Sequence, residues 1–520
     1  MTLSRRSLLQ AGALGGLALA ATSVLAACTP QHASGIVDVQ PTGTPRRGGT
    51  FIHGAMGSGS TGSLSPWISN TSADFARYMA MYETLWYSTG DYRIKPRLVD
   101  TYSVNAAADE WTIKLKSGIT FHNGKPLTAN DVFATFRSIQ DPATAASSSG
   151  ALSVIDLGAS TIVDPLTFRL KLKTGTSNLP EILSTFVPIV PEGFDIAKPV
   201  GTGPFKLKSF VPGQQTHFVR YENYWQIGKP YLDELVIVDF NEDAARVNAL
   251  ASGQILGADT IDFTLSQTLR NKPEVALLVQ KTNSFYPLQM RMDQAPFDDV
   301  RVRQAFRLLV DREELTRGAY NGFARSANDL YSPSDPLFDT GLAPRHQDLD
   351  KAKYLLKQAG AEKLQVTLTT SDFGAGVVSM SQLFAQQAKA AGVTVHVNKL
   401  DSATFFGSNY GTYLFSPNVA PPFNYLYTVQ TTDGPTSTSN YSAFKDEEFT
   451  KLYAQLAPEL NPTRAKEIAA DMQKIQYDRG SLIIPNYYDA IDGHSKKLGG
   501  IVPDVSGLAL YRYANLWLAS

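Results

Sequence analysis

The sequence predicts a mixed α/β or α+β fold with more than one domain. Apolar residues alternate with polar ones in some segments and recur every three to four positions in others, and the two patterns interleave along the chain. The composition of 43% hydrophobic and 18% charged residues is that of a globular protein. No similarity recurs at a spacing of about 20 to 50 residues, which excludes a solenoid. A length of 520 residues predicts about two to four domains.

Residues 1–27 are predicted to be an export signal. Arg5 and Arg6 precede a short apolar run, and their surroundings resemble the twin-arginine signal. The Leu-Ala-Ala sequence directly before Cys28 resembles the box at which bacterial lipoproteins are acylated, so Cys28 is the predicted lipid-attachment site. The alternative is one membrane-spanning helix, since Leu8 to Ala27 could just cross about 30 Å of hydrocarbon.

Residues 28–48 are predicted to be a flexible tether because they are rich in Pro, Gly, Thr and Ser, and the folded body is predicted to start at Gly49. Without residues 1–27 the chain keeps 45 basic against 48 acidic side chains, a net charge of about −3. This balance offers no basic footprint for nucleic acid and no polybasic patch for anionic lipid. Since Cys28 is the only cysteine, no internal disulfide can form.

Strands are predicted where apolar and polar residues alternate. They include Phe51 to Ala55 and the segments around Trp111, Ile113 and Leu115, around Phe168, Leu170 and Leu172, and around Val393, Val395 and Val397.

Helices are predicted where apolar residues recur at helical spacing. One begins near Thr128 or Asn130, either of which could cap it, and carries Val132, Phe133, Phe136 and Ile139 on one face. The others hold Val302, Phe306, Leu309 and Val310, with Gly322 as a stop signal; Ala352, Leu355, Leu356 and Ala359, ending at Gly360; Leu383, Phe384 and Ala388, leading to Gly392; and Ile468, Met472 and Ile475, closed by Gly480.

The residue patterns make no positive case for an enzyme, a cofactor or a metal. Gly57 to Gly62 matches the spacing of a dinucleotide-binding loop, but Leu64, Ser65 and Pro66 follow where a helix should open, so a glycine loop lining a cleft is the alternative. No two of the seven histidines have the spacing of a helical metal pair, and no Gly-x-Ser-x-Gly elbow occurs. A catalytic or metal site assembled from distant positions stays open.

Four stretches together resemble the family 5 extracellular solute-binding proteins, the receptors of ABC importers for peptides, nickel and related solutes. They run from Lys95 to Val132, from Gly201 to Leu235, from Pro296 to Ala305 and from Asn440 to Phe449. Within them, Asn123-Gly124 suits a turn, and Gly201-Thr202-Gly203-Pro204 suits a crossing between lobes. These motifs are therefore expected to be scaffold rather than ligand contacts.

The resemblance implies a two-lobed clamp of the type II periplasmic-binding-protein kind, in its large three-domain form. Domain I would comprise residues 49–62, 199–283 and 492–520, domain II residues 63–198, and domain III residues 284–491. Ligand would be buried between the lobes by hinge closure and then delivered to a permease, without chemical change.

The resemblance also suggests where the solute binds. Dipeptide-binding relatives hold the ligand's ammonium with an aspartate that follows a tryptophan, and its carboxylate with an upstream arginine. Here Phe415 lies at the position of the tryptophan and Asn418 at the position of the aspartate. The position of the upstream arginine falls near Asp372. Because an unpaired buried charge is unfavourable, zwitterionic dipeptides are disfavoured, and a neutral or cationic solute or a longer peptide fits better. The predicted ligand-binding residues are Phe415, Asn418, Asp372, Tyr410 and Tyr425.

The predicted function is that of a monomeric, lipid-anchored substrate-binding protein of an ABC importer. It would take up a peptide or peptide-like solute and face the periplasm or the cell exterior. Its partners would be the solute and a permease in the cytoplasmic membrane, with no nucleic acid. The alternatives are a lipid-anchored hydrolase and a solute sensor that has left transport.

Overall fold

The computed structural model describes residues 41, 43–57, 59–420, 423–437 and 439–519. The predicted signal with Arg5 and Arg6, the lipid-attachment site Cys28 and most of the tether lie outside these residues. Within the described part of the chain, no helix has both the length and the apolar character of a membrane span.

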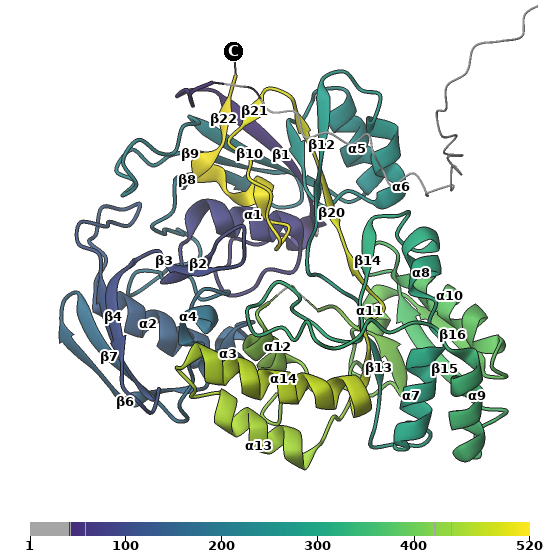
Figure 1. The fold of residues 1–520 in the computed structure, drawn as a ribbon. Coiled ribbons are helices and arrows are strands. Elements are labelled where there is room, and N and C mark those ends of the chain that lie inside the picture. Colours follow the sequence, from purple (N-terminus) through teal and green to yellow (C-terminus); the bar gives the residue numbers. More distant parts are fainter. Residues whose placement is uncertain (1–40, 42, 58, 421–422, 438, 520) are drawn as a thin grey trace, which may run out of the picture. The chain divides into compact units, whose positions relative to one another are not determined.

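The residues predicted as domain I form a seven-stranded sheet, which gathers strands from both ends of the described chain and also takes in Ala490 and Ile491 from the range predicted as domain III (Figure 1). In spatial order the strands are β12 (Val275–Gln280), β20 (Ala490–Ser495), β11 (Gly257–Ala258), β1 (Thr50–Met56), β10 (Glu234–Phe240), β9 (Gln215–Arg220) and β8 (Phe205–Val211). In this sheet the pairs β1–β10 and β1–β11 are parallel, and the other neighbouring strands are antiparallel.

Successive side chains of β1 point to opposite faces of the sheet, so each face packs against a different helix. Phe51 and Ala55 share a core with α1 (Ser72–Met81), while Ile52 packs against the cluster that contains α5 (Asp243–Ala251). Between β1 and α1, the described glycine-loop residues hold only the short turn η1 (Gly59–Thr61). A dinucleotide-binding loop requires a helix to open directly from it, and α1 begins only at Ser72.

Domain II has its own core, which extends from Leu85 to Ile189. Its antiparallel sheet has the order β4 (Val99–Val104), β5 (Glu110–Leu115), β7 (Thr167–Leu172) and β6 (Ile155–Asp164). Smaller elements are β2 (Trp86–Ser88), β3 (Ile94–Pro96), α3 (Ser149–Leu152) and α4 (Leu179–Ile182). The predicted alternation of Trp111, Ile113 and Leu115 is confirmed, because all three are buried on β5.

The helix predicted near Thr128 is α2 (Ala129–Gln140), and Thr128 is its N-cap residue. Asp131 secures this start, since its carboxylate accepts hydrogen bonds from the backbone N–H and the hydroxyl of Thr128, both at 2.8 Å. The apolar face of α2 then covers the sheet, with the rings of Phe133 and Phe168 6.0 Å apart.

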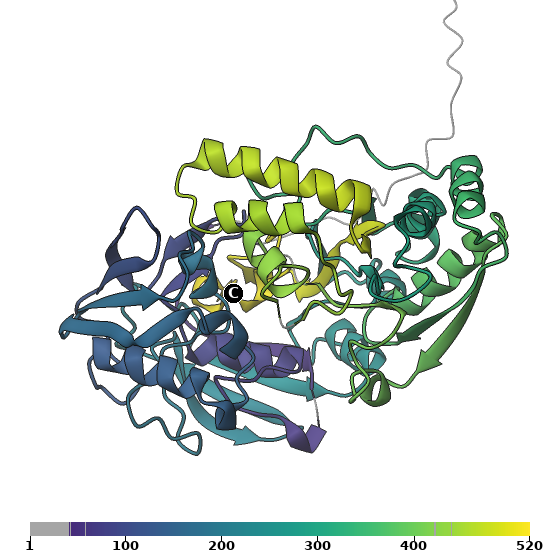
Figure 2. The same cartoon turned by 90° about the horizontal axis from the view of Figure 1, so that it is seen from below.

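Domain III consists of small sheets surrounded by helices. The strands are β13 (Leu288–Met290), β17 (Phe415–Pro417) and β18 (Leu482–Ile483) in one sheet, β15 (Gln365–Ser371) beside β16 (Thr394–Leu400), and β14 (Ala324–Ser326) beside β19 (Asn486–Tyr488). The helices are α7 (Val300–Leu308), α8 (Arg312–Gly318), α9 (Leu349–Gln358), α10 (Val377–Lys389), α11 (Ser402–Phe405), α12 (Tyr425–Thr431), α13 (Glu447–Leu456) and α14 (Pro462–Arg479). Figure 2 shows α13 and α14 side by side.

Most predicted helices of domain III are confirmed at their expected positions, but one differs. The helical pattern that Gly322 was expected to stop is divided into α7 and α8. α7 ends at Leu308, and Asp311 then caps a new helix by accepting a hydrogen bond from the backbone N–H of Glu314 at 2.9 Å.

The motif residues of the resemblance form scaffold contacts. The Nε2 of His122 lies 2.9 Å from the carbonyl oxygen of Gly203, and the backbone N–H of His122 donates to Gly201 O at 2.9 Å, so the first two stretches bind each other. Burial lowers the pKa of His122 to about 4, so the ring is neutral at pH 7. A side chain at Gly201 or Gly203 would overlap the backbone of Met81.

Candidate functional site

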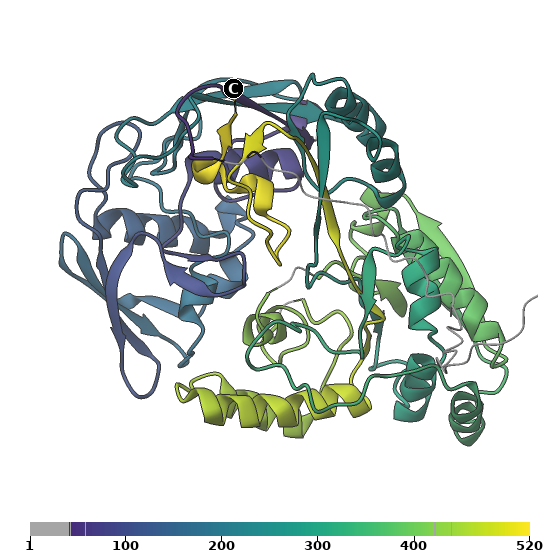
Figure 3. The same cartoon turned by 45° about the horizontal axis from the view of Figure 1, so that its top comes forward.

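Two adjacent segments connect domain I with domain III. β12 and β20 pair antiparallel as far as Gln280 and Ala490. The chain leaves the sheet after Gln280 and returns to it at Ala490 (Figure 3). Beyond the sheet, Thr282 Oγ1 donates to Tyr488 O at 2.6 Å, and Tyr488 N donates to Ser284 O at 3.0 Å. Two short segments tied to each other have the form of a hinge, in which few residues absorb a change in backbone dihedrals.

Domains II and III also touch each other directly. The Asn178 side chain donates a hydrogen bond to Gln430 Oε1 at 2.8 Å, and Ser177 N donates to Ala457 O at 2.6 Å. Tyr427 of α12 packs into the core of domain II, although it comes from domain III. The two domains therefore meet in the conformation that the structure describes.

A cavity of about 560 Å³ lies at this meeting place. From domain II it is lined by Asp91 to Ile94, Ser177, Asn178, Pro180 and Glu181, and from domain III by Ser334 to Leu337, Asn424 and Leu426. Ser334 Oγ donates to Asn283 Oδ1 at 3.2 Å, which links the cavity wall to one of the crossing segments. A movement at the hinge would therefore change the cavity.

Two carboxyl groups, one from each domain, face this cavity. Glu181 on α4 is 3% exposed, and its carboxylate interacts with the hydroxyl of Tyr92 and the backbone of Asn424. Asp335 accepts hydrogen bonds from Leu337 N at 2.7 Å and from Tyr425 N at 2.8 Å, so its position is fixed by the start of α12. Tyr92 is 9% exposed, and its hydroxyl lies next to the Glu181 carboxylate and interacts with it.

The environment makes Glu181 hard to ionise. Burial, followed by the neighbouring negative charge of Asp335, raises the pKa of Glu181 to about 8, although the Asn424 backbone and the Tyr92 hydroxyl lower it. Burial also raises the pKa of Asp335, against the lowering effect of its two backbone N–H donors. At neutral pH the pair therefore holds a proton that exposed carboxyls would lose.

Of the predicted ligand-binding residues, the structure brings Tyr410 and Asn418 together. The Tyr410 hydroxyl donates a hydrogen bond to Asn418 Oδ1. Tyr410 belongs to an aromatic cluster, with ring centroids 4.9 Å from both Phe406 and Tyr441, and Phe406 is 41% exposed. Asn418 follows β17 and is half-buried.

Phe415 and Tyr425 lie in domain cores. The ring of Phe415 is fully buried, with centroids 5.3 Å from Phe297, 5.7 Å from Phe306 and 5.5 Å from Phe384. Tyr425 is also fully buried, and its hydroxyl donates to Gln476 Oε1 at 2.9 Å. Their contacts with a solute stay predictions.

Asp372 lies on the surface and does not line the cavity between domains II and III. Its side chain is 71% exposed and pairs with Lys399 at 3.3 Å. Its part as a counter-charge for a cationic solute stays a prediction. The sequence did not indicate that Glu181 and Asp335 line one cavity. Each of the two is an acidic residue next to a proline, and no spacing connects them because they belong to different domains.

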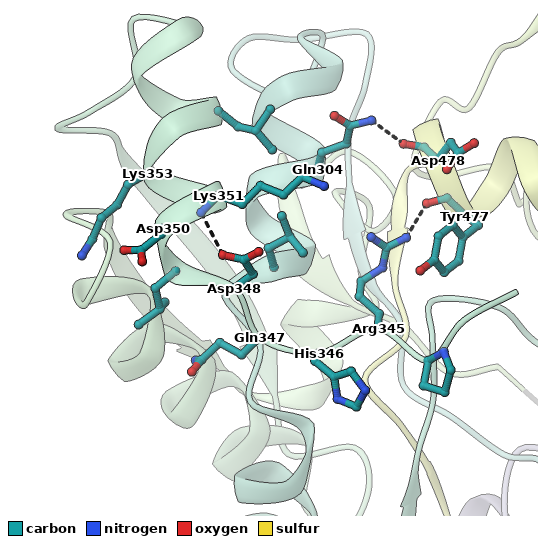
Figure 4. A pocket seen from close by; sticks show the side chains of 14 residues that line it. Gln304, Arg345, His346, Gln347, Asp348, Asp350, Lys351, Lys353, Tyr477 and Asp478 are labelled. Atoms are coloured by element: carbon teal, nitrogen blue, oxygen red, sulfur yellow. Dashed lines mark hydrogen bonds between the residues drawn. The ribbon is translucent and has the colours of Figure 1, made fainter.

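A second cavity, of about 810 Å³, lies within domain III (Figure 4). Its polar groups bind one another across the loop before α9. Gln304 Nε2 donates to Asp478 O at 2.9 Å, and Arg345 donates to Tyr477 O at 2.6 Å. Because no residue of domain II or of the crossing segments lines it, hinge movement would not enclose a solute there.

The described residues contain no group of three or more His, Cys, Asp or Glu side chains that could hold a metal ion. What they do contain is a cavity between domains II and III, together with a pair of adjacent crossings that connects domain I with domain III. This arrangement defines a solute-binding clamp.

Comparison with known proteins identifies the family. A family model described as bacterial extracellular solute-binding proteins, family 5, matches residues 93–437. This chain belongs to that family of solute-binding proteins of transporters. The class predicted from the four sequence stretches is thereby confirmed.

Individual relatives agree with this assignment. The glutathione-binding protein GsiB of Pectobacterium atrosepticum is 29% identical over 363 residues, covering 67% of this chain and 69% of the relative. The structure of AgaA from A. tumefaciens R10 with agropinic acid matches with a TM-score of 0.79 and 23% identity, over 91% of this chain and 99% of that one. DppA of Helicobacter pylori with the peptide STSA matches with a TM-score of 0.77 and 21% identity, over the same shares. The predicted clamp fold is thus confirmed.

Proposed function

We propose that this protein captures a peptide or peptide-like solute outside the cytoplasmic membrane and delivers it to the permease of an ABC importer. The observation that carries the proposal is the cavity of about 560 Å³ between domains II and III, linked through Ser334 and Asn283 to the crossing segments. Membership of a solute-binding family and relatives that bind glutathione, a peptide or an opine support a peptide-like solute.

Simple zwitterionic dipeptides are disfavoured as solutes. Asn418 takes the place at which dipeptide-binding relatives carry an aspartate, and a neutral amide cannot balance a buried ammonium group. Asn418 Oδ1 is also already engaged by Tyr410. Phe406 and Tyr410, whose ring centroids are 4.9 Å apart, do not line the cavity of about 560 Å³, so contact of either ring with the solute stays a prediction.

Uptake measurements test the transport proposal. We expect mass spectrometry of the purified protein to identify a copurified solute, and deletion of the gene to abolish its uptake. Unchanged uptake of every bound solute would favour a sensor, and conversion of a bound solute to product under saturating conditions would favour a hydrolase.

Cys28 is proposed to anchor the protein as a diacylated residue that follows cleavage of the signal. A tethered monomer would stay concentrated near the permease, and two acyl chains give stable retention where one is marginal. We expect Cys28→Ser to shift the protein from the membrane to the soluble fraction with its solute affinity unchanged. Continued membrane association of this variant would indicate an uncleaved spanning segment instead.

A further inference from the structure

We propose that a cavity at the junction of domains I and II binds a small organic molecule with two negative charges, such as a dicarboxylate or a phosphate monoester. The cavity has a volume of about 370 Å³. It shares no lining residue with the cavity between domains II and III. The site therefore goes beyond the proposed function and does not rest on it.

Both domains contribute side chains to the wall of this cavity. Tyr87, Arg97 and Lys116 come from domain II, and Trp225, Lys229 and Arg512 come from domain I. Arg512 joins the two domains, because its Nε donates to Asp504 Oδ2 at 2.8 Å and a terminal nitrogen donates to Ser88 O at 2.9 Å. An anion in the cavity would bind to both domains at once.

The lining of the cavity has an excess of positive charge. Of the described residues that form it, one is acidic, Glu83, and four are basic: Arg97, Lys116, Lys229 and Arg512. Since Arg512 pairs with Asp504, three cations face one carboxyl group. Two positive charges remain in excess even when Glu83 is ionised, and an organic dianion would balance them.

Glu83 is held in the wall by neutral groups. It is 2% exposed, and its carboxylate accepts hydrogen bonds from the Tyr224 hydroxyl and the Trp225 indole N–H, both at 2.8 Å, and from the Thr202 hydroxyl at 3.0 Å. These donors occupy both oxygens. Burial raises the pKa of Glu83, although Arg97 and the three donors lower it. Any protonation of Glu83 would increase the positive excess.

Two half-buried lysines have neutral partners only. Lys116 Nζ donates to Arg97 O at 2.5 Å, and Lys229 Nζ donates to Asn515 Oδ1 at 2.5 Å. Within the described part of the chain, neither ammonium group forms an ion pair with a carboxylate. Each contact uses one of the three donors of an ammonium group, so both lysines can also bind an anion.

The two ammonium groups are costly to bury. Burial lowers the pKa of Lys229, and it lowers that of Lys116 although Asp100 and Glu83 raise it. Asp100 is exposed and does not line the cavity. A bound anion would stabilise the charged form of both lysines.

Aromatic rings position two of the cations. The guanidinium carbon of Arg97 lies 4.7 Å from the centroid of the Tyr87 ring, and Lys116 Nζ lies 4.9 Å from that of Trp225. A guanidinium held in this way can bind a carboxylate or phosphate through two of its N–H groups. The volume of the cavity falls in the range of about 300–1,000 Å³ for small-molecule sites, which favours an organic ligand over a single inorganic ion.

Isothermal titration calorimetry of the purified protein tests the site with succinate and glycerol 3-phosphate as probes, at constant ionic strength. We expect saturable binding of at least one of the two, and none of the neutral succinamide. Lys116→Met and Lys229→Met should each weaken this binding by about 10-fold or more, because each variant lacks one of the unpaired charges.

Lys114→Met and Lys208→Met are the matched controls. Lys114 lies exposed on β5, two residues before Lys116, and Lys208 lies on β8, where it pairs with Glu234 at 2.9 Å. Neither lines the cavity, so both variants should bind the anion like the wild type. Absence of saturable binding for both probes, or equal weakening in the cavity and control variants, would overturn the site and leave the proposed function intact.

Discussion

Arg307 is 1% exposed between α7 and α14, where a cation is unstable without partners. It donates to Leu482 O at 3.0 Å and to Tyr477 O at 3.0 Å, and Arg303 on the same helix donates to Arg479 O at 2.9 Å. Burial lowers the pKa of Arg307 to about 9. Tyr477 O and Arg479 O belong to the last turn of α14, which leaves carbonyl groups without helical partners, and Leu482 O lies on β18. The motif from Pro296 to Ala305 thus serves the packing of domain III.

We expect Arg307→Met to lower the free energy of unfolding by about 1–3 kcal/mol, because the carbonyl group of Leu482 loses this donor, while Tyr477 O keeps the donor Arg345. Arg301→Met on the same helix is the control. Arg301 is 46% exposed and pairs with Asp299, and such a pair contributes about 0–1 kcal/mol. Urea denaturation of both variants measures the difference. Equal losses would show that the carbonyl contacts of Arg307 are unimportant.

Glu181 should make stability depend on pH in a direction opposite to that of an ordinary salt-bridged acid. Its pKa is about 8 in the folded protein and about 4.3 in an unfolded chain. Its contribution to folding is therefore fully present below about pH 4, declines as the pH rises towards 8, and is lost above that value.

Glu181→Gln should therefore melt at a higher temperature than the wild type at pH 8.5 and at a similar temperature at pH 4.5, in the absence of solute. Calorimetry at both pH values measures the difference, and comparison with the wild type at each pH cancels the contribution of other groups. A melting-temperature difference that does not change between the two pH values would contradict the assignment of a buried, proton-binding Glu181.

At the scale of elements, the periodicity of apolar residues in the sequence was sufficient to predict most strands and helices. Val393, Val395 and Val397 predicted the segment of β16 (Thr394–Leu400), and Ile468, Met472 and Ile475 predicted that of α14. The boundary between α7 and α8 was not found, because the apolar spacing continues through Leu309 and Val310 while Asp311 begins a new helix. A cap interrupts a helix without changing its apolar pattern.

The start of α2 can be tested in the same way. Asp131 is 7% exposed, accepts two hydrogen bonds from Thr128 and accepts a third from Glu192 N at 2.9 Å. We expect Asp131→Ala to lower the free energy of unfolding by about 2 kcal/mol. Asn130→Ala, at the exposed alternative cap position, should have an effect below about 0.5 kcal/mol. A larger loss for Asn130→Ala would mean that Asn130, and not Asp131, secures the helix.

At the scale of the whole molecule, we expect the contact between domains II and III to open when solute binds in the cavity between them. The Asn178 side chain donates to Gln430 Oε1 at 2.8 Å across this contact. A disulfide between Asn178→Cys and Gln430→Cys should therefore hold the domains together, and Cys28 is the only natural cysteine that could compete.

We expect the oxidised double variant to lose most of its binding of added solute, and reduction to restore it. The two single-cysteine variants are the controls and should bind like the wild type under both conditions. Association rates measured by stopped-flow fluorescence report the effect. Unchanged association of solute with the oxidised protein would show that it enters by a route that needs no separation of these domains.

The sequence by itself determined most of the secondary structure and the family, because these depend on local periodicity, on turn and cap residues and on short contiguous motifs. Only the tertiary structure decided which side chains share the cavity. It placed Phe415 and Tyr425 in cores, Asp372 on the surface, and Glu181 beside Asp335. The physical reason is that burial and charge proximity arise from chain crossings between domains, and no spacing within one segment records which distant residue will lie opposite it.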